Sequence, residues 1–180
     1  MAAWDEVLRF WFEEIEPASH WAKDPVFDAL IEQRFGDLYQ AACACELYTW
    51  RDQARGRLAE VIILDQFSRN LYRESGQAFA QDRLALALAQ EAVSLGIAAQ
   101  LPAKQRAFLY LPFMHSESAL IHQRALELFA ESGLEDNYRF ELRHKEIVDR
   151  FGRYPHRNAS LGRSSTEEEV RFLQQPGSSF

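Results

Sequence analysis

The sequence is poor in glycine, proline and cysteine and has no long apolar run. Its 180 residues include 8 Gly, 6 Pro and 2 Cys, and the glycines and prolines are widely spread. This composition excludes collagen-like and low-complexity chains. The longest apolar stretches, 58–64 and 107–114, fall short of the roughly 18 residues that cross a bilayer. We therefore expect a single globular domain over residues 1–180 that has no membrane partner.

Basic residues are also fewer than acidic ones: 20 Lys and Arg face 27 Asp and Glu, for a formal net charge of -7. An acidic protein lacks the positive surface that neutralises phosphates, so we expect no nucleic-acid partner. The first residues lack the basic region of a secretory signal. In a helix, Cys43 and Cys45 would point about 200° apart and could not form a disulfide. Together these features predict a cytoplasmic protein with free thiols.

The sequence does contain helical periodicity along nearly its whole length. Asp24-Pro25 combines a helix N-cap with a proline in the first turn, and Thr166 with Glu169 forms a capping box. We predict a loop over 17–21, helices over 4–12, 25–45, 53–71, 82–95, 103–111 (ended by Pro112), 116–131 and 135–151, a short helix from Thr166, and a tail over 174–180. Short loops between such helices indicate an all-α fold of antiparallel hairpins with about eight helices.

The end of the predicted 53–71 helix carries an unusual polar group. The preceding run 58–64 is apolar on nearly every side, which indicates the most buried helix of the fold. Asp65 and Arg69 follow at the spacing of an intrahelical ion pair, with Asn70 beside them. Because buried charges must be paired, two interpretations stay open. The group is either an internal network, or a pocket that Arg69 and Asn70 line and Asp65 orients.

Four of the five histidines lie in the second half of the chain: His115, His122, His144 and His156. His144 falls on the apolar face of its helix, in line with Phe140 and Ile147, which is typical of a core histidine. His115 and His122 are spaced too far apart for a helical metal pair, and the cysteines have no second pair to complete a site. We therefore expect no metal and no cofactor.

Residues 143–163 form a positive segment on an acidic protein. They include six basic and two acidic residues, net +4, which leaves -11 for the rest of the chain. An arginine-rich loop that leads into a helix N-terminus favours phosphate or carboxylate, because guanidinium groups and free backbone N–H groups both donate to anions. The alternative is that these arginines pair with the surplus carboxylates of the protein itself.

Several ordered motifs carry a resemblance to a known family. They are VLRFWF at 7–12, DPVFD at 24–28, LDQFSRN at 64–70, FAQD at 79–82, LPFMHSE at 111–117, RH at 143–144, FGRYPHRN at 151–158 and LGRSST at 161–166. With these motifs the chain resembles, over nearly its full length, the bacterial family known as domain of unknown function 924. The resemblance implies an all-helical fold like that of tetratricopeptide repeat (TPR) proteins. It implies no established activity.

We expect the polar motifs to converge around one cavity. The predicted ligand-binding residues are Arg69, Asn70, His115, Glu117, Arg153, Arg157, Asn158 and Arg163, and the candidate catalytic residues are Asp65, His144 and His156. By analogy with TPR-like folds, which bind ligands on a concave surface, we predict a pocket for a small anionic molecule or a peptide carboxylate. One alternative is a hydrolase or transferase that uses a His/Asp acid-base pair on an anionic substrate. Another is a scaffold in which these residues only secure the packing.

Overall fold

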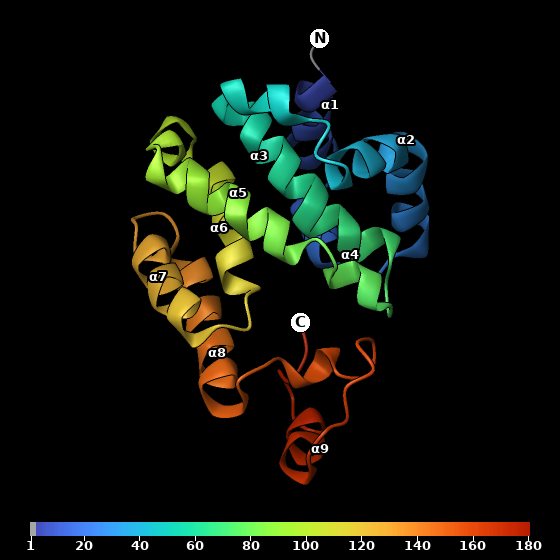
Figure 1. Cartoon of the computed structure of the whole chain (residues 1–180), viewed down its shortest axis with the longest axis vertical. Coiled ribbons are helices and arrows are strands. Elements are labelled where there is room, and N and C mark those ends of the chain that lie inside the picture. Colours follow the sequence, from blue (N-terminus) through green and yellow to red (C-terminus); the bar gives the residue numbers. More distant parts are fainter. Residues whose placement is uncertain (1–2) are drawn as a thin grey trace.

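The computed structural model describes residues 3–180, so Met1 and Ala2, which begin the expected domain, lie outside the described residues. The described chain is helical and contains no β-strand (Figure 1). Its α-helices are α1 (Ala3–Arg9), α2 (Pro25–Cys43), α3 (Ala54–Ile62), α4 (Ser68–Leu71), α5 (Asp82–Ser94), α6 (Ala103–Met114), α7 (Ala119–Phe129), α8 (Glu135–Phe151) and α9 (Glu167–Leu173). Shorter elements are π-helical turns at Phe10–Glu14 and Ile63–Phe67 and 3₁₀ turns at Pro17–Trp21, Tyr48–Asp52, Gly76–Phe79, Ile97–Gln100 and Pro155–Arg157. The all-α class is confirmed, whereas TPR-like stacking stays a prediction.

Local start and stop signals behave as predicted. The Asp24 carboxylate caps α2 by accepting hydrogen bonds from the backbone N–H groups of Val26 (2.9 Å) and Phe27 (3.4 Å). The capping box that begins with Thr166 forms ahead of α9. At the end of α8, Gly152 takes the left-handed conformation (φ 70°), which glycine adopts without strain. These signals act over a few residues and need no tertiary contact.

Some predicted boundaries are wrong. Pro112 does not end its helix, because the fixed φ of proline fits the helix and the last turn, which continues to Met114, packs into the core. The α2 helix ends at Cys43 rather than at Cys45, whose φ is 59° and therefore lies in the left-handed region. Residues Pro17–Trp21, expected as a loop, form a 3₁₀ turn.

The predicted 53–71 helix forms in three consecutive parts: α3, the π turn Ile63–Phe67, and α4. Because these parts follow one another without a break, residues 3–180 form eight separate helices. Every residue from 58 to 68 is buried, as its apolar run predicts. The wider π turn departs from the regular 3.6-residue spacing and holds Asp65 inside the molecule.

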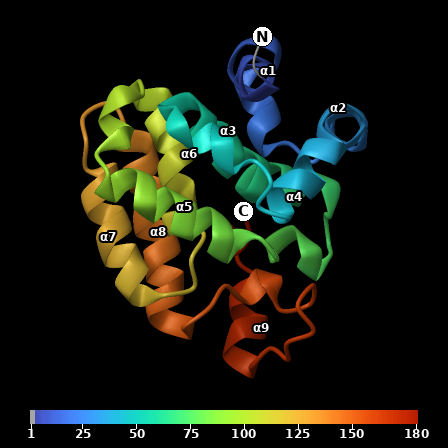
Figure 2. The same ribbon diagram turned by 45° about the horizontal axis from the view of Figure 1, so that its top comes forward.

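The helices enclose one main apolar core, and the C-terminal segment (152–180) contributes to a second, smaller one. Rings from the N-terminal helices pack together in the main core, where the centroids of Phe10, Phe35 and Phe67 lie 5.0 to 6.4 Å apart. The smaller cluster is built around Tyr154 and two residues of α8. Figures 1 and 2 show α7 and α8 beside α6, after which the chain crosses to α9 and its drawn end returns towards the other helices. No helix of the described chain is long and apolar enough to span a membrane.

Candidate functional site

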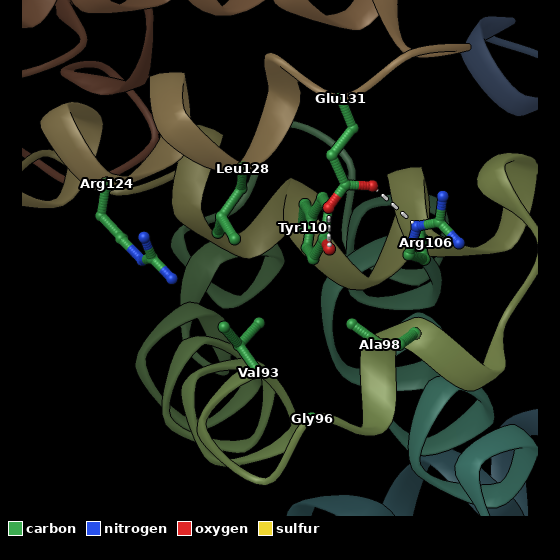
Figure 3. Close-up of a pocket in the computed structure, with 9 residues that line it drawn as sticks. Val93, Gly96, Ala98, Arg106, Tyr110, Arg124, Leu128 and Glu131 are labelled. Carbon is green, nitrogen blue, oxygen red and sulfur yellow. Dashed lines mark hydrogen bonds and ion pairs between the residues drawn. The ribbon is translucent and has the colours of Figure 1, made fainter.

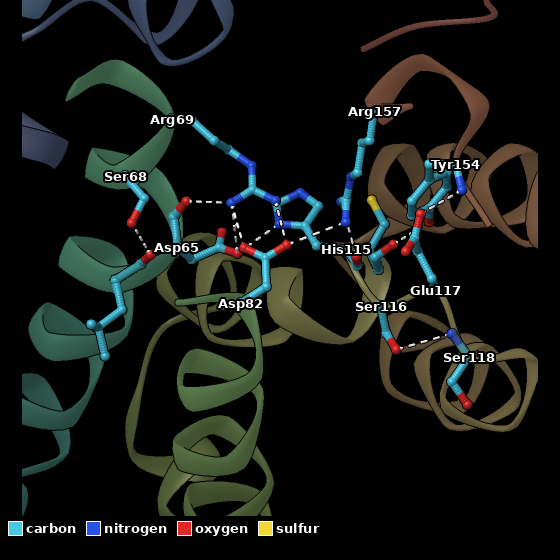
Figure 4. A network of polar contacts seen from close by, with 12 residues as sticks. Asp65, Ser68, Arg69, Asp82, His115, Ser116, Glu117, Ser118, Tyr154 and Arg157 are labelled. Carbon is cyan, nitrogen blue, oxygen red and sulfur yellow. Dashed lines mark hydrogen bonds and ion pairs between the residues drawn. The ribbon is translucent and has the colours of Figure 1, made fainter. Parts of the chain in front are cut away.

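A buried aspartate and a histidine form the centre of the candidate site (Figure 4). Asp65 lies in the π turn after α3 and His115 directly follows α6, and the Oδ1 atom of Asp65 is 2.6 Å from the Nδ1 atom of His115. Burial opposes ionisation of Asp65, but the interaction with His115 and the charge of Arg69 outweigh it and lower its pKa to about 2. Burial also outweighs the attraction of Asp65 for a proton on His115 and lowers the pKa of His115. At neutral pH the pair is therefore a carboxylate and a neutral imidazole that donates from Nδ1.

Two arginines from distant parts of the chain meet on Asp82, the first residue of α5. The Nη1 and Nη2 atoms of Arg69 lie 2.8 and 3.0 Å from the two Asp82 carboxylate oxygens. The Nη1 atom of Arg157 lies 3.4 Å from the same carboxylate. Burial opposes the charge of Arg69, yet Asp82 and Asp65 raise its pKa. Sequence reasoning missed Asp82, although its place at the end of the FAQD motif at 79–82 was a usable signal.

Arg157 is buried but only partly satisfied. Its side chain is 6% exposed, and the guanidinium carbon lies 4.6 and 4.7 Å from the ring centroids of Phe79 and Tyr154. Nη2 donates to the carbonyl oxygen of His115 at 2.9 Å, whereas the buried Nε has no hydrogen-bond partner among the described residues. Burial first, and the charge of Arg69 second, lower the pKa of Arg157. We refer to the following five residues as the Asp65 cluster: Asp65, Arg69, Asp82, His115 and Arg157.

His144 and His156 lie around Tyr154, next to the Asp65 cluster. Their ring centroids are 5.8 and 5.7 Å from that of Tyr154. His144 donates from Nδ1 to the carbonyl oxygen of Phe140 at 2.7 Å, while the buried Nδ1 of His156 has no partner within residues 3–180. Burial lowers the pKa of both histidines to about 3, so both rings are neutral at pH 7. His144 is buried on its helix, as predicted. Phe140, which was predicted to lie on the same apolar face, is 52% exposed.

Glu117 and Tyr154 fasten the C-terminal segment to this region. The Glu117 carboxylate accepts hydrogen bonds from the Tyr154 backbone N–H at 2.7 Å and from both Nη atoms of Arg163 at 2.8 Å. The Tyr154 hydroxyl lies 3.1 Å from Nε2 of His122, whose Nδ1 is 2.6 Å from a buried Glu141 oxygen. Tyr154 was not predicted as a site residue although it lies in the FGRYPHRN motif, and nothing in the sequence distinguishes Glu141 from the other acidic residues.

The remaining predicted residues do not join the Asp65 cluster. They bond to neighbours outside it: Asn70 to Asp28 of α2 (2.8 Å), Arg153 to Glu169 (2.7 and 2.8 Å), Asn158 to Ser165 (3.0 Å) and Arg163 to Glu117 (2.8 Å). Lys145 and Arg150 are paired in the same way with Asp149 and Glu168. Most of the positive segment is thus neutralised by carboxylates of the protein, as the alternative interpretation anticipated.

A groove of about 470 Å³ lies elsewhere, between α5, α6 and α7 (Figure 3). Its lining includes Arg106, Tyr110 and Glu131 but none of the predicted site residues. The Glu131 carboxylate accepts from the Tyr110 hydroxyl at 2.9 Å and from Arg106 Nε at 2.8 Å, so these three polar groups satisfy one another. In the part of the chain that the structure describes, no three His, Cys, Asp or Glu side chains are grouped closely enough to hold a metal ion.

The comparisons with known proteins agree with the resemblance noted in the sequence. The family model described as "Bacterial protein of unknown function (DUF924)" matches residues 7–177. A solved structure, that of the protein of unknown function ATU0120 from Agrobacterium tumefaciens, is 37% identical to this chain with a TM-score of 0.90, over 95% of this chain and 96% of that one. No curated protein matches. With a family match over nearly its whole length, the chain belongs to the DUF924 family of bacterial proteins.

Proposed function

We propose that the Asp65 cluster binds a small anionic ligand, a phosphate ester or a carboxylate, through Arg157 and Arg69. The observation that carries the proposal is the incomplete pairing of Arg157. A guanidinium has five N–H donors, and here one makes a hydrogen bond of ordinary length while Nε has no partner among the described residues. Burial and the neighbouring Arg69 both disfavour its charge, so an added anion would be stabilised by both arginines.

The surroundings hold this guanidinium in place for such a ligand. Phe79 and Tyr154 each lie within 5 Å of its central carbon, and the His115 carbonyl oxygen fixes Nη2. An arginine held in this way loses little conformational entropy when it binds an anion. The other predicted anchors, Arg153 and Arg163, already place their planar ends on Glu169 and Glu117 and are weaker candidates.

Calorimetric titration with inorganic phosphate and with acetate tests the proposal. We expect Arg157→Gln to weaken binding of the preferred anion about tenfold to a hundredfold, the usual worth of a charge-assisted hydrogen bond. Arg157→Lys, which keeps the charge but not the planar fork, should retain part of the affinity. The matched control is Arg150→Gln, which removes an arginine paired with Glu168 at an exposed site.

The control variant should bind as the wild type does. The proposal is contradicted if neither anion binds the wild type while Arg157→Gln lowers the melting temperature, because that pattern belongs to a purely structural network.

One observation favours a second candidate, acid-base catalysis on the bound anion. His115 donates from Nδ1 to the buried carboxylate of Asp65, which leaves Nε2 as a proton acceptor that has no partner in the described chain. A carboxylate that orients a neutral imidazole is the arrangement of a general base. We infer that His115 would accept a proton from water or from a substrate hydroxyl in a hydrolase or transferase reaction.

Hydrolysis of p-nitrophenyl phosphate tests this second candidate. We expect His115→Asn to lower kcat/KM by about 10²- to 10⁴-fold, the usual contribution of a general base. Because burial lowers the pKa of His115, the wild-type rate should stay level from pH 8 to below pH 6.5 and fall only in more acidic buffer. His20→Asn is the control, since His20 bonds to the Trp11 carbonyl oxygen, outside the cluster. Absence of turnover by the wild type contradicts catalysis on phosphate esters and leaves anion binding intact.

A further inference from the structure

We propose that His144, Tyr154 and His156 form a recess for an aromatic ring, which Phe180 occupies in the free protein, and that the anionic ligand of the Asp65 cluster carries such a ring. This inference rests on the proposed anion site and specifies the chemical class of its ligand. The structure places all three of these residues beside the Asp65 cluster, and binding of the anionic group alone does not involve them.

The ring of Phe180 makes close contact with all three members of the recess. Its centroid lies 3.8 Å from that of His144, 4.6 Å from that of His156 and 5.2 Å from that of Tyr154. The rings of His156 and Tyr154 are inclined to it by 65° and 85°, which are edge-to-face geometries that aromatic pairs favour. A neutral imidazole accepts an aromatic neighbour in this way, and burial keeps both histidines neutral.

The recess and the anion anchor share one side chain. The Tyr154 ring that contacts Phe180 also lies 4.7 Å from the guanidinium carbon of Arg157. A ligand whose ring lies in the recess can therefore place an anionic group near Arg157 through a short linker. The proximity of the recess to Arg157 therefore favours small aryl phosphates and aryl carboxylates as ligands.

Phe180 is held in a way that permits its displacement. Its side chain is 54% exposed, and no hydrogen bond involving it is made within the described residues. The nearest anchor of its segment is the Ser178 hydroxyl, which donates to the Leu173 carbonyl oxygen at 3.1 Å. Burying about half of a phenyl ring favours the state with Phe180 in the recess roughly fivefold to tenfold over the state with the recess open. A ligand ring must compete with that bias.

Titrations with phenyl phosphate and methyl phosphate separate the ring from the charge, since both are phosphate monoesters. We expect Phe180→Ala to bind phenyl phosphate about fivefold more tightly than the wild type, because the competing ring is gone. Methyl phosphate should bind both proteins equally. The matched control is Tyr48→Ala, because Tyr48 is also an exposed aromatic residue (63%) but makes no ring contact with the recess. As a second readout, the imidazole proton shifts of His144 should change in Phe180→Ala and not in Tyr48→Ala.

The outcomes distinguish this inference from the proposed function. If each ester binds the wild type and Phe180→Ala with the same affinity, the anion site stands and the aromatic recess is refuted. If Phe180→Ala melts at a lower temperature and its affinity for phenyl phosphate is unchanged, Phe180 has only a packing role and the inference is again refuted. If neither ester binds any of the proteins, the proposed function fails together with the inference.

Discussion

At the scale of single residues, burial sets the protonation state of the histidines in and around the candidate site. His144 and His156 have pKa values of about 3 because their surroundings exclude the water that would solvate an imidazolium. Asp65 has the opposite balance, since the hydrogen bond from His115 and the charge of Arg69 keep it ionised although it is buried. The site at neutral pH therefore contains neutral imidazoles beside fixed arginine and carboxylate charges.

This protonation pattern predicts a protein that loses stability in mild acid. In the unfolded chain each histidine binds a proton near pH 6.5, whereas in the folded chain His144 and His156 bind one only near pH 3. The unfolded state thus binds more protons throughout that window, and stability falls as the pH falls from about 6.5. At pH 5.5 the two histidines should together cost about 3 kcal/mol relative to pH 7.5. Urea denaturation at the two pH values measures the difference.

The His144→Asn variant isolates one of these contributions. An asparagine amide can donate to the Phe140 carbonyl oxygen in place of Nδ1 but does not titrate. The variant should lose about 1.4 kcal/mol less than the wild type between pH 7.5 and 5.5. An identical pH dependence in both proteins would show that His144 is not held neutral.

At the scale of elements, α3 packs closely against the turn that precedes it. A Cβ atom built on Gly56 would overlap the backbone oxygen of Trp50, in the 3₁₀ turn Tyr48–Asp52. Only glycine allows this approach, and the approach positions the start of the central helix. By contrast, a Cβ atom on Gly36, in the middle of α2, would meet no atom of residues 3–180 within 4 Å beyond the backbone of its own helix.

These two glycines predict opposite effects for the same substitution. Gly56→Ala should destabilise the protein by about 1–3 kcal/mol, because backbone must move to relieve the overlap. Gly36→Ala should stabilise it by about 0.5–1 kcal/mol, because alanine has the higher helix propensity and meets no obstruction. Thermal and urea unfolding measure both changes. A neutral Gly56→Ala substitution would contradict the close packing of α3 on this turn.

At the scale of the whole molecule, polar contacts secure the C-terminal segment to the helical body. Arg157 reaches Asp82, while Arg163 and the Tyr154 N–H both reach Glu117. Burial opposes ionisation of Glu117, but these donors and the charge of Arg157 lower its pKa, so it is a carboxylate at neutral pH. One carboxylate thus joins two points of the segment to the loop after α6.

Removing that charge should loosen the segment without unfolding the rest. We expect Glu117→Gln to cost about 1–3 kcal/mol, since three charge-assisted hydrogen bonds are weakened. Hydrogen exchange should accelerate in residues 152–166 and stay unchanged in α3. The control is Glu168→Gln, which removes an exposed partner of Arg150 and should cost less than about 0.5 kcal/mol. Uniform acceleration over the whole chain would contradict local docking through Glu117.

Much of the fold was predictable because it depends on neighbours in the chain. The caps at Asp24 and Thr166 and the stop at Gly152 involve atoms a few residues apart, and each forms as its local pattern predicts. The burial of the central helix follows from the run 58–64, in which every side chain except that of Glu60 is apolar. The prediction for Pro112 is wrong because the packing of its last turn outweighs the local signal of proline.

In the candidate site, most of the unusual polar residues can be recognised from their motifs, whereas their pairing depends on how the helices pack. Asp65 is bonded to His115, 50 positions away, and Arg157 is aimed at Asp82 rather than at a neighbour. Arg153 and Arg163, identical to Arg157 in chemistry, face Glu169 and Glu117 instead. The reason is physical: spacing along the chain governs contacts within one helix, whereas a buried charge takes whichever partner the packing of separate helices brings within about 3 Å.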